Sequence, residues 1–168
     1  MKIAIYPGSF DPVTKGHEDI IKRASEMFDI LYVVVLGNPA KKTLFTVDER
    51  VELIENVISD LDNVKADSSH ALAITYAKEK NAKFIVRGLR ATDDFEYELN
   101  IFAFNQHIEK EIDTIFLMTK LHNSFISSSG VKEMASYNAN IDGLVSPCVK
   151  AAIHKKYEAE KGNDGICT

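Results

Sequence analysis

The stretch ILYVVVLG, residues 30–37, decides the fold class of this chain. Its side chains are nearly all apolar and several are β-branched, so it lacks the polar–apolar alternation of a strand with one solvated face. A strand that is covered on both faces is typical of a parallel sheet flanked by helices. The stretch therefore predicts a central strand of an α/β protein.

Shorter strand-like runs and helical patterns alternate on both sides of this stretch. Further strands are expected at residues 2–6, 64–66, 84–87 and 114–118. Helices are expected at residues 18–28, 46–59, 72–80, 94–109, 128–135 and 147–161. Because strands and helices alternate repeatedly, the sequence predicts a Rossmann-like, doubly wound, five-stranded parallel sheet with helices on both faces.

Two of the expected helix starts carry capping residues. Thr46 and Glu49 stand in capping-box register, in which each side chain can satisfy an unpaired N–H of the first turn. Ser146 before Pro147 places a capping hydroxyl ahead of a residue whose fixed φ suits the first helical position.

Length and composition fit one domain. The chain has 168 residues, of which 45% are hydrophobic and 27% are charged, as is ordinary for a folded domain. We expect a single domain over residues 1–161 and a flexible tail over residues 162–168. The net charge of −5 gives no general attraction to nucleic acid or to an anionic membrane, so any anion site must be local.

The sequence carries few signals of the compartment in which the protein works. The two cysteines, Cys148 and Cys167, match no zinc pattern and favour a reducing compartment. The N-terminal stretch MKIAIYPGSFDP does not have the pattern of a signal or transit peptide, and no run reaches the roughly 18 apolar residues that a membrane helix needs. We therefore expect a cytoplasmic protein without nucleic-acid or membrane partners.

The segments after the strands matter most, because parallel sheets bind ligands beyond the carboxyl ends of their strands. Residues 7–17, PGSFDPVTKGH, form a loop that brings His17 to a helix start, which is a position suited to anions. A neutral imidazole there can donate a hydrogen bond to a phosphate oxygen. For an isolated Gly-His pair, a helix cap without chemistry is the more common alternative.

Two further loops carry cations. Lys41 and Lys42 follow the strand at residues 30–37, where they could hold phosphate or lie in a solvated loop. The segment RGLR, residues 87–90, contains two of the four arginines of the chain. A guanidinium offers a planar fork of donors that suits phosphate. Structural salt bridges to the acidic residues at 93–98 are an equally weighted alternative.

A serine-rich segment, SFISSSG at residues 124–130, follows the last expected strand. Serines at a helix start cap the helix, and their hydroxyl and backbone N–H groups can also face a phosphate. Together, four βα loops carry groups suited to phosphate at the edge where this fold binds ligands. This combination predicts a site for phosphorylated ligands.

These motifs resemble those of a known family. PGSFDP at residues 7–12 with T-x-G-H at residues 14–17 is similar to the T/HxGH signature of the nucleotidyltransferase superfamily. Four further segments are spaced as in bacterial phosphopantetheine adenylyltransferases: NPAKK at 38–42, RGLR at 87–90, DFEYE at 94–98 and SFISSS at 124–129. The resemblance covers residues 2 to about 156.

The resemblance implies an activity. Members of that family transfer AMP from ATP to 4′-phosphopantetheine, which gives dephospho-coenzyme A and pyrophosphate in the penultimate step of coenzyme A synthesis. It also implies Mg²⁺ as a cofactor, a homohexamer and feedback inhibition by coenzyme A. No carboxylate cluster in the sequence is typical of a dedicated metal site, so we expect Mg²⁺ to be held mainly through phosphates.

The resemblance also implies roles for individual residues. The implied catalytic residues are His17 and Lys41. The implied phosphopantetheine ligands are Ser9, Lys41, Ala73 and Arg87. The implied ATP ligands are Ser9, Phe10, His17, Gly88, Leu89, Arg90, Glu98, Asn123, Ser124, Phe125, Ile126, Ser127, Ser128 and Ser129.

The implied reaction depends on positioning and charge stabilisation. The attacking phosphate oxygen is already an anion, so in-line attack on the α-phosphorus of ATP needs no general base. Charge that develops in the transition state would be stabilised by hydrogen-bond donors from His17, Lys41, Arg90, Ser128 and Ser129.

Two alternatives stay open from the residues themselves. The same chemistry could act on another phosphorylated acceptor, such as nicotinate mononucleotide or glycerol phosphate. A non-catalytic nucleotide-binding domain of the same α/β type is the alternative from a different class. A second phosphate site argues against it, because a nucleotide sensor has no need of one.

The expected helix at residues 94–109 favours an oligomer. Its apolar side chains fall on two faces: Phe95, Leu99 and Phe102 on one, and Tyr97, Ile101, Phe104 and Ile108 on the other. A helix that is apolar on more than one face is buried on more than one side. Deep burial within a monomer is the alternative.

Overall fold

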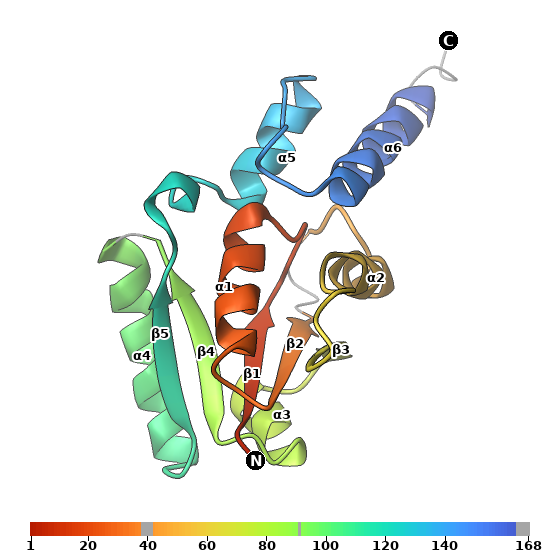
Figure 1. Ribbon diagram of the computed structural model, residues 1–168. Coiled ribbons are helices and arrows are strands. Elements are labelled where there is room, and N and C mark those ends of the chain that lie inside the picture. Colours follow the sequence, from red (N-terminus) through yellow and green to blue (C-terminus); the bar gives the residue numbers. More distant parts are fainter. Residues whose placement is uncertain (38–41, 91, 164–168) are drawn as a thin grey trace.

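The computed structural model describes residues 1–37, 42–90 and 92–163 (Figure 1). Five parallel strands form one sheet in the order β3-β2-β1-β4-β5. The strands are β1 (Ile3–Gly8), β2 (Ile30–Leu36), β3 (Val64–Ser69), β4 (Phe84–Leu89) and β5 (Asp113–Met118). The predicted Rossmann-like sheet is confirmed. The strand order reverses between β1 and β4, which is where such sheets bind ligands.

Helices cover both faces of the sheet, as predicted. Figure 1 shows α1 (Lys15–Ser25) and α2 (Val47–Val57) in front of the sheet, with α3 (Ala73–Glu79) and α4 (Thr92–Ile108) behind it. The front core joins α1 and α2 to one set of strand side chains, including Ala4 and Val33. The alternate side chains, including Ile5 and Val34, pack against α3. This two-sided burial explains the continuous apolar run of β2.

The remaining helices lie beyond the carboxyl ends of the strands. A short 3₁₀ turn, η1 (Leu121–Asn123), leads from β5 to α5 (Ser128–Ser136), and α6 (Pro147–Asn163) follows. Val131, Ala135, Val149 and Ile153 bind these two helices to the front core. The last helix extends to Asn163, two residues beyond the expected end at 161. The tail expected at 162–168 otherwise falls outside the described residues.

Two strands are longer than the sequence predicted. β1 was expected to end at Tyr6, but it pairs with β2 as far as Gly8. Pro7 is tolerated because the described ladder between β1 and β4 ends at Ile5, so no N–H is needed on that side. β3 was expected to end at Ala66, but it pairs with β2 as far as Ser69. As an edge strand it needs one pairing partner, so its polar end is compatible with the sheet.

One helix start is also shifted. α1 begins at Lys15 rather than at residue 18, with Thr14 as the N-cap. The shift places His17 in the first helical turn, as the third helical residue. The predicted capping box of α2 is confirmed, since the Glu49 N–H donates to Thr46 Oγ1 at 3.2 Å and the Thr46 N–H donates to Glu49 Oε2 at 2.8 Å.

α4 lies at the edge of the molecule beside β4 and β5 (Figure 1). Deep burial of this helix within a monomer was the alternative to an oligomer. It is wrong, because Phe104 is 69% exposed and Tyr97 is 64% exposed. Glu98 is its one buried residue among those whose burial is described. Within the described part of the chain, no helix combines the length and apolar character that crossing a membrane requires.

Candidate active site

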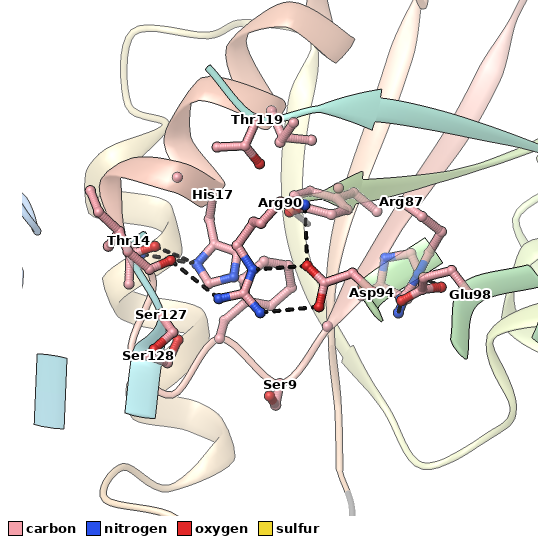
Figure 2. Close-up of a pocket in the computed structure, with 18 of the residues that line it drawn as sticks. Ser9, Thr14, His17, Arg87, Arg90, Asp94, Glu98, Thr119, Ser127 and Ser128 are labelled. Carbon is pink, nitrogen blue, oxygen red and sulfur yellow. Dashed lines mark hydrogen bonds and ion pairs between the residues drawn. The ribbon is translucent and has the colours of Figure 1, made fainter. Parts of the chain in front are cut away.

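A pocket of about 300 Å³ opens at the switch point between β1 and β4 (Figure 2). Those two strands are paired only at Ala4–Phe84 and Ile5–Ile85, and the pocket lies beyond these pairs. Its lining comes from β1, α1, β4, α4, α5 and the loops between them: Tyr6, Pro7, Gly8, Ser9, Phe10, Thr14, Gly16, His17, Ile20, Arg87, Gly88, Arg90, Asp94, Glu98, Thr119, Ile126, Ser127, Ser128 and Ser129.

His17 faces this pocket with a defined tautomer. The backbone N–H of Thr14 donates to His17 Nδ1 at 3.0 Å, and Thr14 Oγ1 lies 3.1 Å from the same nitrogen. Nδ1 is therefore an acceptor, and the ring proton resides on Nε2. The N-cap thus turns the imidazole into a hydrogen-bond donor directed at the pocket.

The environment of His17 keeps its ring neutral. Burial and the Arg90 cation lower the pKa of His17 to about 4. The ring of Phe10 packs edge-on against the imidazole, with centroids 5.0 Å apart. Phe10 in turn contacts Tyr6 at 5.3 Å, so the orientation of His17 depends on the loop after β1. Near pH 7, His17 acts as a neutral donor.

Arg87 is held at the pocket wall by a carboxylate of α4. Its Nε donates to Glu98 Oε2 at 2.7 Å, its Nη2 pairs with Glu98 Oε1, and its Nη1 donates to the carbonyl oxygen of Pro7 at 2.8 Å. Glu98 is only 8% exposed. Although burial opposes it, the Glu98 carboxylate holds the pKa of Arg87 above its usual value. The side chain of Arg87 lines the pocket, so its guanidinium can contact an anion bound there.

Arg90 forms a second, more exposed ion pair. Figure 2 shows it lying between His17 and Asp94. Its Nε is 3.2 Å from Asp94 Oδ2, and its Nη1 is 3.4 Å from the carbonyl oxygen of Ile126. The structural salt bridges weighed against phosphate binding are therefore real for both arginines. They do not remove the arginines from the pocket, since both side chains line it.

The serine-rich segment forms the start of α5, as predicted. Ser127 is the N-cap and accepts the Gly130 N–H at 3.0 Å. Ser128 Oγ donates to the carbonyl oxygen of Pro12 at 2.8 Å, so its single proton is engaged. The backbone N–H groups of Ser128 and Ser129 have no partner within the helix, because the first turn lacks preceding carbonyls. Backbone amides at α5 thus supply donors for an anion.

Several implied ligands do not line the pocket. The structure brings most of them together, but five do not line it: Ala73, Leu89, Asn123, Ser124 and Phe125. Asn123 and Leu89 are buried, and Phe125 is 71% exposed. Lys41, with Asn38 and Pro39, lies outside the described residues. Its implied role stays a prediction.

Some pocket residues were not singled out in the sequence. Tyr6 was read as part of a strand, yet strand alternation places its side chain toward α1, where burial raises the pKa of its phenol. Thr14 was part of the histidine motif, but its control of the ring tautomer depends on three-dimensional contact. Asp94, in contrast, belongs to the acidic stretch 93–98 that the sequence offered as salt-bridge partners for the arginines, and its pair with Arg90 confirms that alternative.

The side chains of the pocket that could bind a metal ion bear on the implied Mg²⁺. Both pocket carboxylates, Asp94 and Glu98, are paired with arginines. In the described ranges, no group of three or more His, Cys, Asp or Glu side chains is arranged to hold a metal ion. This donor set suits a Mg²⁺ ion that is carried by phosphate oxygens and water.

The fold and the phosphate-suited pocket define a class. The chain matches the cytidylyltransferase-like family model over residues 5–134 and belongs to that family of nucleotidyltransferases. A solved structure described as a putative nicotinate-nucleotide adenylyltransferase from Vibrio parahaemolyticus superposes with a TM-score of 0.70. It is 20% identical, and the match covers 94% of this chain and 96% of that one. At this identity the likeness supports the fold alone.

Closer relatives place the chain within the class. It is 51% identical over 156 residues to a phosphopantetheine adenylyltransferase of Clostridium novyi (strain NT), covering 92% of this chain and 97% of the relative. It is 53% identical over 158 residues to a phosphopantetheine adenylyltransferase of Clostridium kluyveri, covering 94% and 96%. The chain belongs to the phosphopantetheine adenylyltransferase family.

Proposed function

We propose that this pocket transfers AMP from ATP to 4′-phosphopantetheine, releasing pyrophosphate and dephospho-coenzyme A. One observation carries the proposal: donors from three segments face one pocket at the switch point, in a chain about half identical to phosphopantetheine adenylyltransferases. The donors are His17 Nε2, the two arginines and the amides at the start of α5. Such a set suits two phosphorylated substrates.

The chemistry follows from these donors. A phosphate oxygen of the acceptor attacks the α-phosphorus of ATP in line, and the bond to the β-phosphate oxygen breaks as pyrophosphate leaves. Because the nucleophile is an anion, the chain has to position the two substrates and stabilise developing charge. His17 donates a hydrogen bond from Nε2–H to a phosphate oxygen and keeps its proton. Its low pKa makes it a poor proton carrier at neutral pH.

We assign the acceptor and the nucleotide to different residues of the pocket. Arg87, with its fork fixed by Glu98, contacts the acceptor phosphate. Gly88, Arg90 and the start of α5 contact ATP. Lys41 assists at the acceptor phosphate. Mg²⁺, carried on the phosphates of ATP, neutralises their charge when bound.

A coupled pyrophosphate-release assay tests the function. ATP is supplied with 4′-phosphopantetheine, nicotinate mononucleotide or glycerol phosphate, with and without Mg²⁺. We expect rapid release only with 4′-phosphopantetheine and Mg²⁺. Release with a different acceptor would move the chain to that chemistry, and ATP binding without release with any acceptor would favour a non-catalytic nucleotide-binding domain.

The role of His17 has its own test. His17→Ala removes the Nε2 donor, and we expect kcat to fall by roughly 10²-fold or more, as for loss of a transition-state donor. The KM for ATP should change little, because the other donors remain. An unchanged kcat in this variant would refute the assignment.

The proposal also covers the cellular location, the assembly and the regulation of the protein. We infer a cytoplasmic homohexamer that coenzyme A inhibits by feedback. The exposed apolar side chains of α4, including Tyr97 and Phe104, support assembly. We expect feedback inhibition because coenzyme A carries both the pantetheine arm and an adenine nucleotide, and so resembles both substrates.

A further inference from the structure

The loop after β1 holds an unfavourable backbone conformation at the pocket. Phe10 has φ of 45°, in the left-handed region that a bulky side chain rarely adopts. Its ring is nevertheless 2% exposed and packs against His17. Gly8 makes room for it, because a Cβ at Gly8 would lie 2.9 Å from the Phe10 ring. A strained residue of this kind persists only where its surroundings fix it from several sides.

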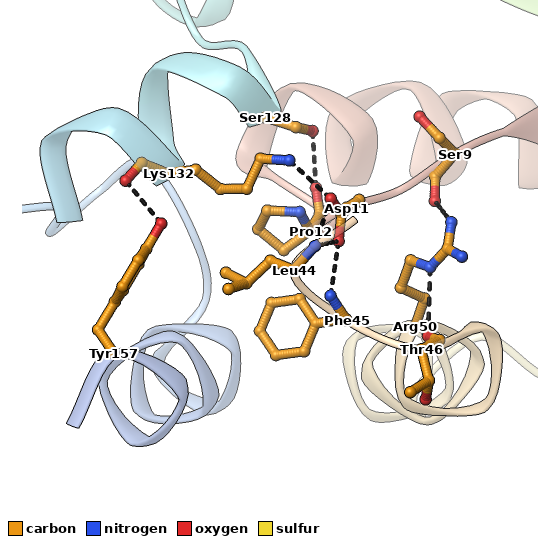
Figure 3. Close-up of polar contacts among 10 residues, drawn as sticks. All are labelled: Ser9, Asp11, Pro12, Leu44, Phe45, Thr46, Arg50, Ser128, Lys132 and Tyr157. Atoms are coloured by element: carbon orange, nitrogen blue, oxygen red, sulfur yellow. Dashed lines mark hydrogen bonds and ion pairs between the residues drawn. The ribbon is translucent and has the colours of Figure 1, made fainter. Parts of the chain in front are cut away.

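Asp11, the next residue, makes the central contacts that fix this loop (Figure 3). Its Oδ1 accepts the Phe45 N–H at 2.9 Å, and its two oxygens lie 3.1 and 3.0 Å from the Leu44 nitrogen. Its Oδ2 is 2.6 Å from Lys132 Nζ on α5. Asp11 is 2% exposed, so these partners replace water. Although burial alone would raise it, these bonds hold the pKa of Asp11 below its usual value.

Further bonds surround this carboxylate. Arg50 of α2 donates from Nη1 to the carbonyl oxygen of Ser9 at 2.8 Å, and Ser128 Oγ donates to the carbonyl oxygen of Pro12 at 2.8 Å. On the far side, Tyr157 of α6 donates to the carbonyl oxygen of Lys132 at 3.0 Å. Figure 3 shows that these groups come from both sides of the loop. Asp11 is thus the point where the loop, the segment entering α2 and α5 are joined.

We propose that Asp11 is a positioning residue for AMP transfer, because its carboxylate holds the loop of Ser9 and Phe10 at a fixed distance from the start of α5. Both elements line the phosphate pocket. The inference rests on the proposed function. Asp11 itself does not line the pocket and acts through Phe10 and through Lys132.

The expected effect is on turnover. Loss of the carboxylate frees the loop to relax from the left-handed conformation of Phe10, which shifts the ring against which His17 packs. A misplacement of about 1 Å can lower a rate by about 10²-fold. ATP affinity depends on many contacts and should change less. An effect on kcat in a folded protein therefore separates positioning from a purely structural role.

The experiment uses three variants and one control. Asp11→Asn removes the charge and leaves an amide that cannot accept every donor around it. Asp11→Asn combined with Lys132→Met also removes the unpaired cation. Lys132→Met alone keeps the bonds to Leu44 and Phe45 and breaks only the ion pair between Asp11 and α5. The control is Asp142→Asn, because Asp142 makes a 2.6 Å pair with Lys150 away from the pocket. Thermal midpoints, kcat and the KM for each substrate are measured for all proteins.

We expect Asp11→Asn to lower the midpoint and to reduce kcat by about 10²-fold, with the KM for ATP changed by less than about threefold. The double variant should recover stability without recovering kcat, and Lys132→Met should also turn over more slowly. Recovery of kcat in the double variant would overturn the inference, since Asp11 would then serve only to neutralise Lys132.

Three further outcomes are decisive. If the Asp11 variants do not fold, a wild-type kcat in Lys132→Met overturns the inference, and a reduced kcat at an unchanged midpoint supports it. If the wild-type protein and Asp142→Asn transfer no AMP to 4′-phosphopantetheine, the proposed function fails and the inference fails with it. Active wild-type protein together with fully active Asp11→Asn refutes the inference alone.

Discussion

At the scale of single residues, the chemistry depends on which proton each side chain holds. His17 has its Nδ1 occupied by the Thr14 N–H and its pKa lowered to about 4, so it is a donor through Nε2 at every pH near neutrality. Arg87 and Arg90 are already paired with carboxylates of α4. Their orientation is therefore set before a substrate arrives, which lowers the entropy cost of binding.

The neutral His17 should make folding stability depend on pH. Its folded pKa of about 4 lies below the ordinary 6.5, so the unfolded chain takes up a proton between these values that the folded chain does not. Stability from this group is present above pH 6.5 and is lost as the pH falls toward 4. Urea unfolding at about pH 7 and pH 5 should show a larger loss for wild type than for His17→Gln. Equal losses would contradict burial of a neutral ring.

Glu98 should act on the acceptor through Arg87. Because its carboxylate fixes the Arg87 fork, Glu98→Gln should raise the KM for 4′-phosphopantetheine by about tenfold, as for loss of a charged hydrogen bond, and the KM for ATP much less. The matched control is Glu96→Gln, an exposed position on the same helix. Steady-state kinetics with each substrate varied in turn provides the test. A larger change for ATP would support the nucleotide contact that the resemblance implied.

At the scale of elements, helix starts position the site. The N-caps of α1, α2 and α5 are Thr14, Thr46 and Ser127. Thr14 and Ser127 line the pocket, and Thr46 follows Phe45, which donates to Asp11. α2 also carries Arg50, which holds the loop after β1. The sequence predicted the starts of α2 and α5 because their caps are local. It placed the start of α1 three residues late, since no apolar periodicity marks the first turn.

The cap of α2 can be tested by stability. Thr46→Ala removes the hydroxyl that accepts the Glu49 N–H, and we expect a loss of about 1 kcal/mol in the free energy of unfolding. Chemical denaturation measures the difference. Ser59→Ala, at an exposed position after the end of α2, is the control and should change stability by less than about 0.5 kcal/mol. Equal effects of the two changes would argue against the cap.

At the scale of the whole molecule, the single chain leaves an apolar surface uncovered. The exposed fractions on α4 are 46% for Leu99, 69% for Phe104 and 53% for Ile108. The double-faced apolar pattern in the sequence is thus not explained by packing inside one chain. A surface of this kind is expected to be buried by another copy.

Assembly should therefore depend on α4. Phe104→Glu places a charge on this surface, and we expect it to shift the protein from the proposed hexamer toward smaller species, because burying an unpaired charge is costly. Sedimentation velocity measures the distribution. The control, Met27→Glu, changes an apolar residue that is 43% exposed after the end of α1. A wild-type protein that sediments as a monomer would refute the proposal.

The sequence by itself determined the fold class, most helix positions and the loops that carry the site. Its strongest signals are local: the buried run of β2, the capping box of α2 and the serine cap of α5. It could not determine which carboxylates pair with the two arginines, the tautomer of His17 or the buried role of Asp11. Those depend on contacts such as Asp11–Lys132, 121 positions apart, which only tertiary packing brings together.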